Sequence, residues 1–195
     1  MHAIILLAFA IIGIPWGFTA ADPLCARFGQ PAYTATRVTQ TASAPPMVSQ
    51  VFVSGPRLRI EVPAPREGRM VTLFTPDLQA LFLNTANPPK AMRLDVAQPV
   101  ALPAEERRER EERASGRITL ITEMRGASGQ WHEIGRVVCR RDGVLLEARQ
   151  ILAREAGPAL IETRQSEIRL GAQDPALFRL PAGFRLIEPP PRPQR

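Results

Sequence analysis

Few side chains in this sequence could do chemistry, and their spacing offers only weak catalytic arrangements. His132 lies shortly after Ser128, and a serine nucleophile needs such a base within hydrogen-bonding reach. Glu123 and Glu133 flank a glycine-bounded turn at 126–129, so two carboxylates could face each other for general acid–base work. We interpret Ser128 as a loop serine, His132 as an edge histidine and both glutamates as solvated. The sequence therefore predicts no catalytic residue and no enzyme.

Metal and cofactor sites are no better represented. Apart from His2, near the start, His132 is the sole histidine, and it has no partner ligands at a spacing typical of metal sites. The sequence contains no Gly-x-Ser-x-Gly elbow and no phosphate-binding glycine loop. We predict neither a metal site nor a cofactor.

The two cysteines, Cys25 and Cys139, are the remaining reactive groups. An even pair favours a disulfide in an exported protein, because oxidising compartments preserve such bonds. Closing a loop of ~100 residues contributes up to about 4.7 kcal/mol in the chain-entropy treatment. The alternative is a pair of buried or unpaired thiols, and we favour the disulfide.

The first residues favour export. An apolar run over residues 3–14 is broken by Gly13 and Pro15 and is followed by the small residues of a signal-peptidase site. We predict a signal peptide at 1–21, cleaved after Ala21 or, less favourably, after Ala20, and a periplasmic or secreted protein with no stable membrane span. The absence of Lys and Arg before the apolar run leaves an uncleaved anchor as the alternative.

Composition and charge indicate a globular domain rather than a nucleic-acid-binding protein. Hydrophobic residues make up 45% of the 195 positions, which suffices for a core. The formal charge is +6, but the arginines are scattered along the chain and alternate with apolar residues, and Lys90 is the single lysine. A nucleic-acid footprint would need a basic block with interleaved aromatic residues, so we predict no nucleic-acid partner.

Short segments with alternating apolar and polar residues fill the chain from Tyr33 onward. The clearest is 57–62, in which Leu58, Ile60 and Val62 share one face and charged residues share the other. Turn residues separate about ten such segments, as expected of an antiparallel meander. A sheet of that many strands curls, because twist accumulates from strand to strand. We predict a mainly β fold with a concavity built from the apolar faces.

One segment, 102–113, breaks the alternation. It carries four opposite-charge pairs at i,i+4 and has no apolar stripe, so it predicts a short charged helix or a loop that protrudes from the sheet. A docking arm for a partner, centred on 105–113, is the alternative. The closing stretch 174–187 is expected to form an edge strand and a plug for the core, and 188–195 a disordered proline-rich tail.

The order of these segments resembles the LolA-like superfamily of periplasmic lipoprotein carriers and their uncharacterised exported relatives. The likeness runs through "YTATRVTQT", "VFVSGPRLRIEV", "MVTLFTPDLQALFLNT", "RRDGVLLEARQI" and "DPALFRLPAGFRLI". It implies a half-open barrel over 22–187. The carriers have an arginine before the turn proline that helps to hold a lid closed, whereas this chain has Gly55 before Pro56. There is also little chain before Tyr33 for the carriers' N-terminal helix, and the uncharacterised branch is therefore the nearer likeness.

The resemblance implies a hydrophobic concavity that shields a lipid, a lipoprotein acyl chain or another apolar ligand. The residues expected to line it are Val51, Val53, Leu58, Ile60, Leu73, Leu81 and Leu83. Ordinary core packing is the alternative for each of them. The corresponding alternative for the protein is an envelope structural or interaction protein with a self-filled core and a protein partner.

Overall fold

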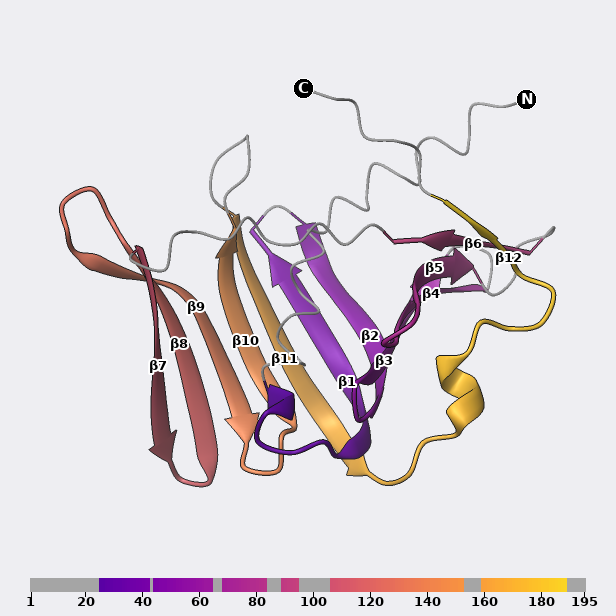
Figure 1. The fold of residues 1–195 in the computed structure, drawn as a ribbon, viewed down its shortest axis with the longest axis horizontal. Coiled ribbons are helices and arrows are strands. Elements are labelled where there is room, and N and C mark those ends of the chain that lie inside the picture. Colours follow the sequence, from indigo (N-terminus) through magenta and orange to yellow (C-terminus); the bar gives the residue numbers. More distant parts are fainter. Residues whose placement is uncertain are drawn as a thin grey trace.

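The computed structural model describes residues 25–42, 44–64, 68–83, 89–94, 106–152 and 159–188, which form twelve strands in one sheet (Figure 1). The strands are β1 (Ala32–Thr41), β2 (Ala44–Ser54), β3 (Arg57–Ala64), β4 (Gly68–Phe74), β5 (Gln79–Leu83), β6 (Lys90–Arg93), β7 (Arg107–Ala114), β8 (Arg117–Arg125), β9 (Trp131–Arg140), β10 (Leu145–Leu152), β11 (Ala159–Leu170) and β12 (Arg185–Ile187). The predicted signal peptide at 1–21 and the predicted tail beyond Glu188 lie outside the described residues.

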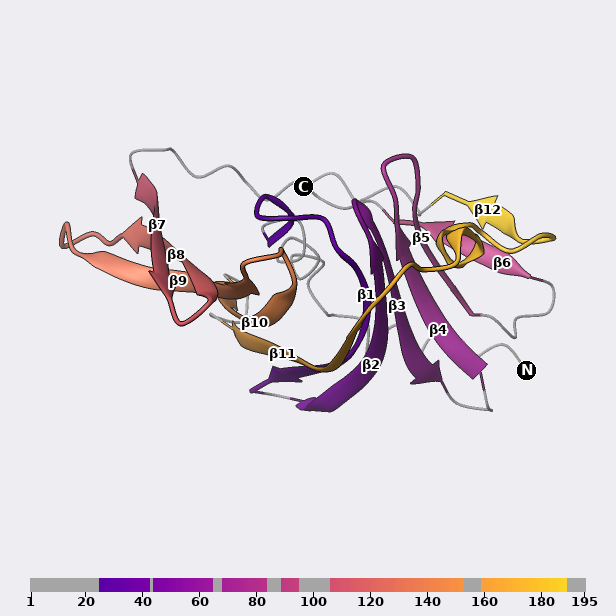
Figure 2. The ribbon, with the colours of Figure 1, turned by 90° about the horizontal axis from the view of Figure 1, so that it is seen from below.

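The sheet runs from β12 through β6, β5, β4, β3, β2, β1, β11, β10, β9 and β8 to β7. Each neighbouring pair is antiparallel except β12 with β6, which is parallel. Twist accumulates over so many strands, and the sheet curves strongly without closing into a barrel (Figure 2). The predicted fold class, a mainly β protein built on one curved antiparallel sheet, is confirmed, with the parallel β12 as an addition.

The alternation in β3 sets the two faces of this sheet. Leu58 pairs with Val53 of β2, which pairs with Tyr33 of β1. Ile60 pairs with Val51, which pairs with Ala35. Directly opposed residues of antiparallel strands point to the same side, so these apolar side chains share one face, called the inner face from here on. Segment 25–29 packs on this same face through Cys25 and Phe28 and lies on the concave side of the curve in Figure 2, which places the inner face on that side.

Two buried clusters occupy the inner face. The first, the β1–β5 cluster, comprises Tyr33, Ala35, Val51, Val53, Leu58, Phe74, Leu81, Leu94 and Val144. The second, the β8–β10 cluster, comprises Cys25, Ile118, Leu120, Val137, Cys139, Leu145 and Ala148. The register Thr39–Thr163–Ala148–Val137–Leu120 shows that both clusters lie on the same side of the sheet.

A third cluster lies on the opposite, outer face and is covered by the C-terminal segment 171–188. Val71, Leu73, Phe82 and Ala91 of β4–β6 pack there against Phe178. Asp174 caps the 3₁₀ helix η3 (Pro175–Phe178) by accepting a hydrogen bond of 2.8 Å from the Ala176 amide. The prediction of an edge strand and plug is confirmed by β12 and Phe178, although the residues just before Arg179 form a helical turn rather than an extended strand.

The charged segment differs from its prediction. Arg107–Ala114 is a strand, β7, paired along its whole length with β8 at the edge of the sheet, and is neither a helix nor a loop. Without an apolar stripe a helix there would bury nothing, whereas pairing with β8 satisfies one side of the backbone. The same alternation of Arg and Glu forms i,i+2 ion pairs along a strand, as between Arg107 and Glu109 at 2.8 Å.

The cysteines are joined. Cys25 and Cys139 form a disulfide that ties the segment before β1 to β9, in agreement with the favoured alternative from the sequence. Among the described residues, none lies in a helix with the length and apolar character needed to cross a membrane.

Candidate ligand-binding face

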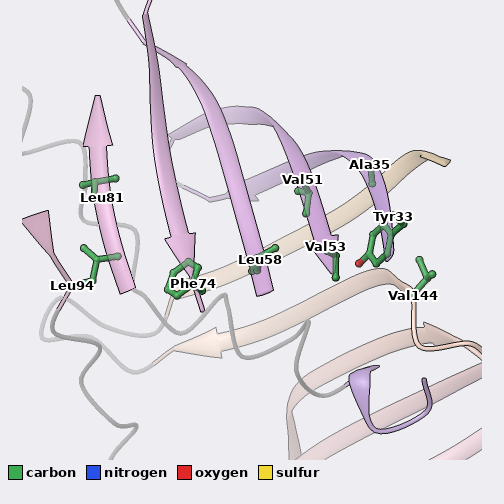
Figure 3. Packing of buried hydrophobic residues seen from close by; sticks show 9 residues of the cluster. All are labelled: Tyr33, Ala35, Val51, Val53, Leu58, Phe74, Leu81, Leu94 and Val144. Carbon is green, nitrogen blue, oxygen red and sulfur yellow. The ribbon is translucent and has the colours of Figure 1, made fainter. Parts of the chain in front are cut away.

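Five of the seven predicted lining residues come together on the inner face. Val51, Val53, Leu58 and Leu81 belong to the β1–β5 cluster (Figure 3), and Ile60 packs against it. They come from three different strands because the register sets their apolar positions side by side. Four of these side chains are buried, Val51 completely at 0% exposure, and Ile60 is partly buried. The structure thus assembles a continuous apolar surface on the inner face.

Of the remaining two predicted residues, Leu73 lies on the other face of the sheet. Leu73 pairs with Arg59 and not with Leu58, so it points to the outer face and packs in the cluster with Phe178. The structure thus corrects the predicted lining at this position, because a residue of β4 one place away, Phe74, faces inward instead. Leu83 ends β5 opposite Met70, and its side chain lies outside what the structure describes.

The rim of the β1–β5 cluster is formed by residues outside the strands. Leu94 follows β6, and its amide donates to the carbonyl of Gln79 at 2.9 Å. Val144 precedes β10, and its carbonyl accepts from the Arg140 amide at 2.8 Å. Figure 3 shows these two side chains at opposite ends of the cluster. Both residues lie just outside strands, and their backbone hydrogen bonds continue the pairing of β5 with β6 and close the turn between β9 and β10.

A buried polar band separates the two inner-face clusters. Arg37 pairs with Gln165 on one side and with Ser49 on the other, and Thr39 pairs with Thr163. Arg37 is only 3% exposed. In the favourable orientation of its amide, Gln165 accepts from Arg37 Nη2 at 2.7 Å and donates to the Leu145 carbonyl at 3.1 Å. The apolar surface of β1–β5 therefore ends at a hydrogen-bonded band that fills the middle of the inner face.

Sequence reasoning missed this band. Arg37 and Thr39 occupy the same parity as Tyr33 and Ala35 in β1, so the alternation itself placed a cation on the buried face. The band could have been predicted from Arg37, because an arginine at an inward-facing position of an otherwise apolar pattern needs buried hydrogen-bond partners.

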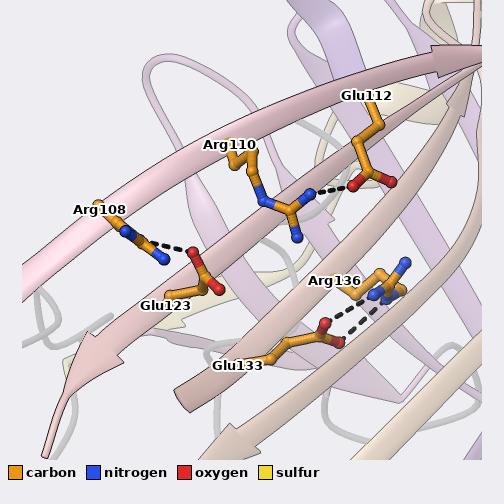
Figure 4. A network of polar contacts seen from close by, with 6 residues as sticks. All are labelled: Arg108, Arg110, Glu112, Glu123, Glu133 and Arg136. Atoms are coloured by element: carbon orange, nitrogen blue, oxygen red, sulfur yellow. Dashed lines mark hydrogen bonds and ion pairs between the residues drawn. The ribbon is translucent and has the colours of Figure 1, made fainter. Parts of the chain in front are cut away.

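The candidate carboxylates Glu123 and Glu133 do face each other across the β8–β9 hairpin. Each is held by an arginine: Arg108 Nε donates to Glu123 at 2.7 Å and Arg136 Nη2 to Glu133 at 2.6 Å (Figure 4). The hydrogen bond from Arg136 holds the pKa of Glu133 below its usual value, against a smaller opposing effect of burial. A carboxyl group with a lowered pKa is a poor general acid at neutral pH.

The other candidate groups are dispersed. His132 is exposed on β9 opposite Met124, and Ser128 is exposed in the turn between β8 and β9. Within the described part of the chain, no cluster of histidine, cysteine, aspartate and glutamate side chains is arranged to hold a metal ion.

A buried ion pair anchors the outer face. Glu61 of β3 accepts from Arg59 Nε at 2.7 Å and from Arg69 Nη1 at 2.5 Å. Burial alone would raise the pKa of Glu61, but the hydrogen bonds and charges of Arg69 and Arg59 outweigh it and hold that pKa below its usual value. Arg59 also donates to the Leu177 carbonyl at 2.9 Å, which fastens the C-terminal segment to β3.

Arg57, just beyond Gly55 and Pro56, serves the same outer face. Its guanidinium lies 5.2 Å from the centre of the Phe178 ring, a distance at which a cation attracts an aromatic face. The sequence places this arginine opposite to the lining residues, and the structure agrees. It therefore holds the C-terminal segment and does not reach the inner face.

Comparison with known proteins identifies the fold but no family. No protein-family model matches the sequence, and no curated protein matches it. An uncharacterised conserved protein from Thermus thermophilus superposes with a TM-score of 0.52 at 14% identity, over 89% of this chain and 99% of that one. The two proteins share a fold. A LolA superfamily protein from Nitrosomonas europaea superposes with a TM-score of 0.42 at 11% identity, over 83% of this chain and 97% of that one.

Proposed function

We propose that this protein is an exported binding protein that holds an acyl chain, from a lipid or a lipoprotein, on the inner face of β1–β5. The observation that carries the proposal is the apolar cluster around Val51, Val53 and Leu58, which lies on the concave side of an open, curved sheet. The sequence resemblance to lipoprotein carriers supports the same reading. The protein acts by binding and not by catalysis.

An aliphatic chain suits this surface on energetic grounds. Each buried methylene group contributes about 0.8 kcal/mol, and the cluster extends across five neighbouring strands. In this proposal the chain enters where the side chains of Leu94 and Val144 move aside, while their backbone hydrogen bonds to Gln79 and Arg140 stay in place. The polar band at Arg37 and Gln165 marks the inner end of the site, since an acyl chain gains nothing by covering it.

Export is supported by two independent features. Residues 1–21 have the pattern of a signal peptide, and Cys25 and Cys139 form a disulfide that an oxidising compartment preserves. A periplasmic or secreted location would place the concave face where lipids and lipoproteins are transferred.

Complete burial of Val51 and its neighbours favours one alternative, an envelope protein whose inner face is filled by its own side chains. The two functions differ in whether a ligand can replace the contacts between the side chains of the cluster. A binding protein exchanges its own packing for ligand, whereas a self-filled core excludes ligand.

Titration of the purified mature protein with a dansyl-labelled fatty acid separates these alternatives. We expect saturable uptake, lost in Leu58→Trp and Leu81→Trp, whose bulky rings fill the inner face. Val48→Trp is the matched control, because Val48 lies on β2 with 50% exposure and pairs with Val38 on the outer face. No uptake by the wild-type protein and no lipid in its solvent extract would refute the proposal. Unfolding of Leu58→Trp would assign that residue to a self-filled core.

A further inference from the structure

The second inner-face cluster is covered by a segment of the chain itself. Phe28, in the short segment 25–29, is partly buried and packs against the β8–β10 cluster. The segment folds into a turn in which the Phe28 amide donates to the Cys25 carbonyl at 3.0 Å. Figure 2 shows this turn, in indigo, on the concave side of the sheet. The Phe28 side chain thus covers a second apolar surface on the concave side of the sheet, the β8–β10 cluster.

The disulfide is the covalent anchor of this segment. Cys25 and Cys139 are both fully buried within the same cluster, so the bond fixes one end of the turn to β9. The other end fits closely against the β9–β10 turn. A Cβ atom on Gly29 would lie 2.3 Å from the Asp142 carbonyl oxygen, and one on Gly143, whose φ is +90°, 2.1 Å from that of Gly29. Such approach is open only to glycine.

The remaining contacts of the segment are exposed and individually weak. Arg27 lies 3.9 Å from Glu109 and 3.7 Å from Glu111 of β7, and both carboxylates are at the surface. The guanidinium groups of Arg27 and Arg113 approach the Phe28 ring at 4.9 and 5.9 Å. Exposed pairs of this kind contribute about 0–1 kcal/mol each. The covalent bond is therefore the dominant restraint on the segment.

We propose that residues 25–29 are a built-in occupant of a second acyl-chain site on the inner face of β8–β10, and that reduction of the Cys25–Cys139 disulfide opens it. The ligand of this site is an apolar chain, which would replace the apolar Phe28 side chain. It would contact Ile118, Leu120, Val137, Leu145 and Ala148. The inference rests on the proposed function in that it extends the same binding face beyond the polar band. The oxidised chain offers the β1–β5 surface alone, and the reduced chain offers both.

The redox step needs a dithiol as reductant. Its electron pair breaks the S–S bond, its two protons pass to the sulfurs of Cys25 and Cys139, and the dithiol closes to its own disulfide. Breaking the S–S bond removes no hydrogen bond of the sheet, because Cys139 pairs with Ile118 and Leu145 through backbone atoms.

Release of the segment is measured without any lipid, by trypsin cleavage after Arg27 followed by mass spectrometry. Dithiothreitol should speed this cut at least about tenfold, which corresponds to a fall of ~1.4 kcal/mol in the local opening free energy. The Cys25→Ser/Cys139→Ser variant should be cut at the fast rate with or without dithiothreitol. An unchanged rate, or loss of the strand signal in circular dichroism on reduction, would overturn the proposal.

Occupation of the site is measured by titration with dansyl-labelled undecanoic acid. The reduced protein should bind a second equivalent of the fatty acid, and the bound fatty acid should further speed the cut after Arg27, because ligand and segment compete for one surface. No gain in uptake on reduction would contradict the proposal. Uptake by the reduced protein alone would support the second site and refute a ligand on β1–β5. Uptake limited to the β1–β5 site in both redox states would refute the second site and support the ligand on β1–β5.

Discussion

The two halves of the sheet are supported differently. Strands β3–β6 are packed on both faces, with Leu58 in the inner cluster and Val71 and Phe178 in the outer one. Strands β8 and β9 are packed on the inner face, where Leu120 lies, and β7 is exposed along its whole length, whereas the outer face of β7–β9 carries an ion-pair network that includes Arg108 and Arg136 (Figure 4). One half has two apolar layers, and the other has one apolar layer and a disulfide.

Under the proposed function, this difference bears on where side chains can move without unfolding the sheet. The outer layer of β3–β6 would hold the strands together when the Leu94 side chain moves aside, and a ligand would take its place. In β8–β10 the inner layer is the main apolar layer, and the disulfide and segment 25–29 compensate for the missing outer one. The proposed binding on β1–β5 should therefore depend on the C-terminal segment that covers the far side of the sheet.

The largest expected effect comes from removing that cover. Phe178→Ala should destabilise the protein by about 3–5 kcal/mol, the usual cost of truncating a buried phenylalanine. Because Phe178 lies on the outer face, fatty-acid uptake by the remaining folded protein should weaken as well. Guanidinium unfolding measures the first effect and dansyl titration the second. A loss below about 1 kcal/mol would mean that the outer layer does not support β3–β6.

A smaller effect is expected from the buried ion pair beneath the same segment. Glu61→Gln should cost about 1–3 kcal/mol at pH 7, because Arg59 and Arg69 lose a charged acceptor at a buried position. The folded-state pKa of Glu61 is lowered, so its contribution is complete above the unfolded value near 4.5 and is lost as pH falls through the folded value.

The difference between Glu61→Gln and the wild-type protein should therefore shrink on acidification below about pH 4.5. Guanidinium midpoints at pH 7 and pH 3 measure it. A constant difference between the two would show that the charge of Glu61 contributes nothing and that the side chain acts through packing alone.

The smallest effect is expected on the charged outer face of β7–β9. Arg108→Ala removes the pair with Glu123 and the stacking on Trp131 at 4.4 Å, yet it should cost only about 0.2–1 kcal/mol because the arginine is exposed. Fatty-acid uptake should stay at the wild-type level. A loss of more than about 2 kcal/mol in the free energy of unfolding, measured from the guanidinium midpoint, would contradict this prediction. It would mean that this face stabilises the protein about as much as Phe178 does.

The sequence was sufficient for the fold because its signals are local and periodic. The alternation around Leu58 and the spacing of turn residues identify strands, and twist then requires a curved sheet. The charged segment was misread because Arg and Glu at i,i+4 also stand at i,i+2, so the pairs in Arg107–Ala114 suit a strand as well as a helix. The spacing of charges within this segment does not predict its pairing with β8.

The candidate site was only partly predictable for a related reason. Val51, Val53, Leu58 and Leu81 follow from alternation within each strand, but Leu73 shows that facing depends on register between strands, which a one-residue shift reverses. The covering of the β8–β10 cluster by Phe28 depends on a contact between distant parts of the chain. The residues around Phe28 show no local sequence pattern from which this contact could be predicted.

The most direct test of a ligand on the inner face of β1–β5 is photocrosslinking with a diazirine-bearing fatty acid, followed by peptide mapping. We expect the label on the inner-face residues Val51, Leu58 and Leu81 in the oxidised protein, with competition by unlabelled fatty acid. Label confined to outer-face positions such as Val48, or spread without competition, would contradict the account.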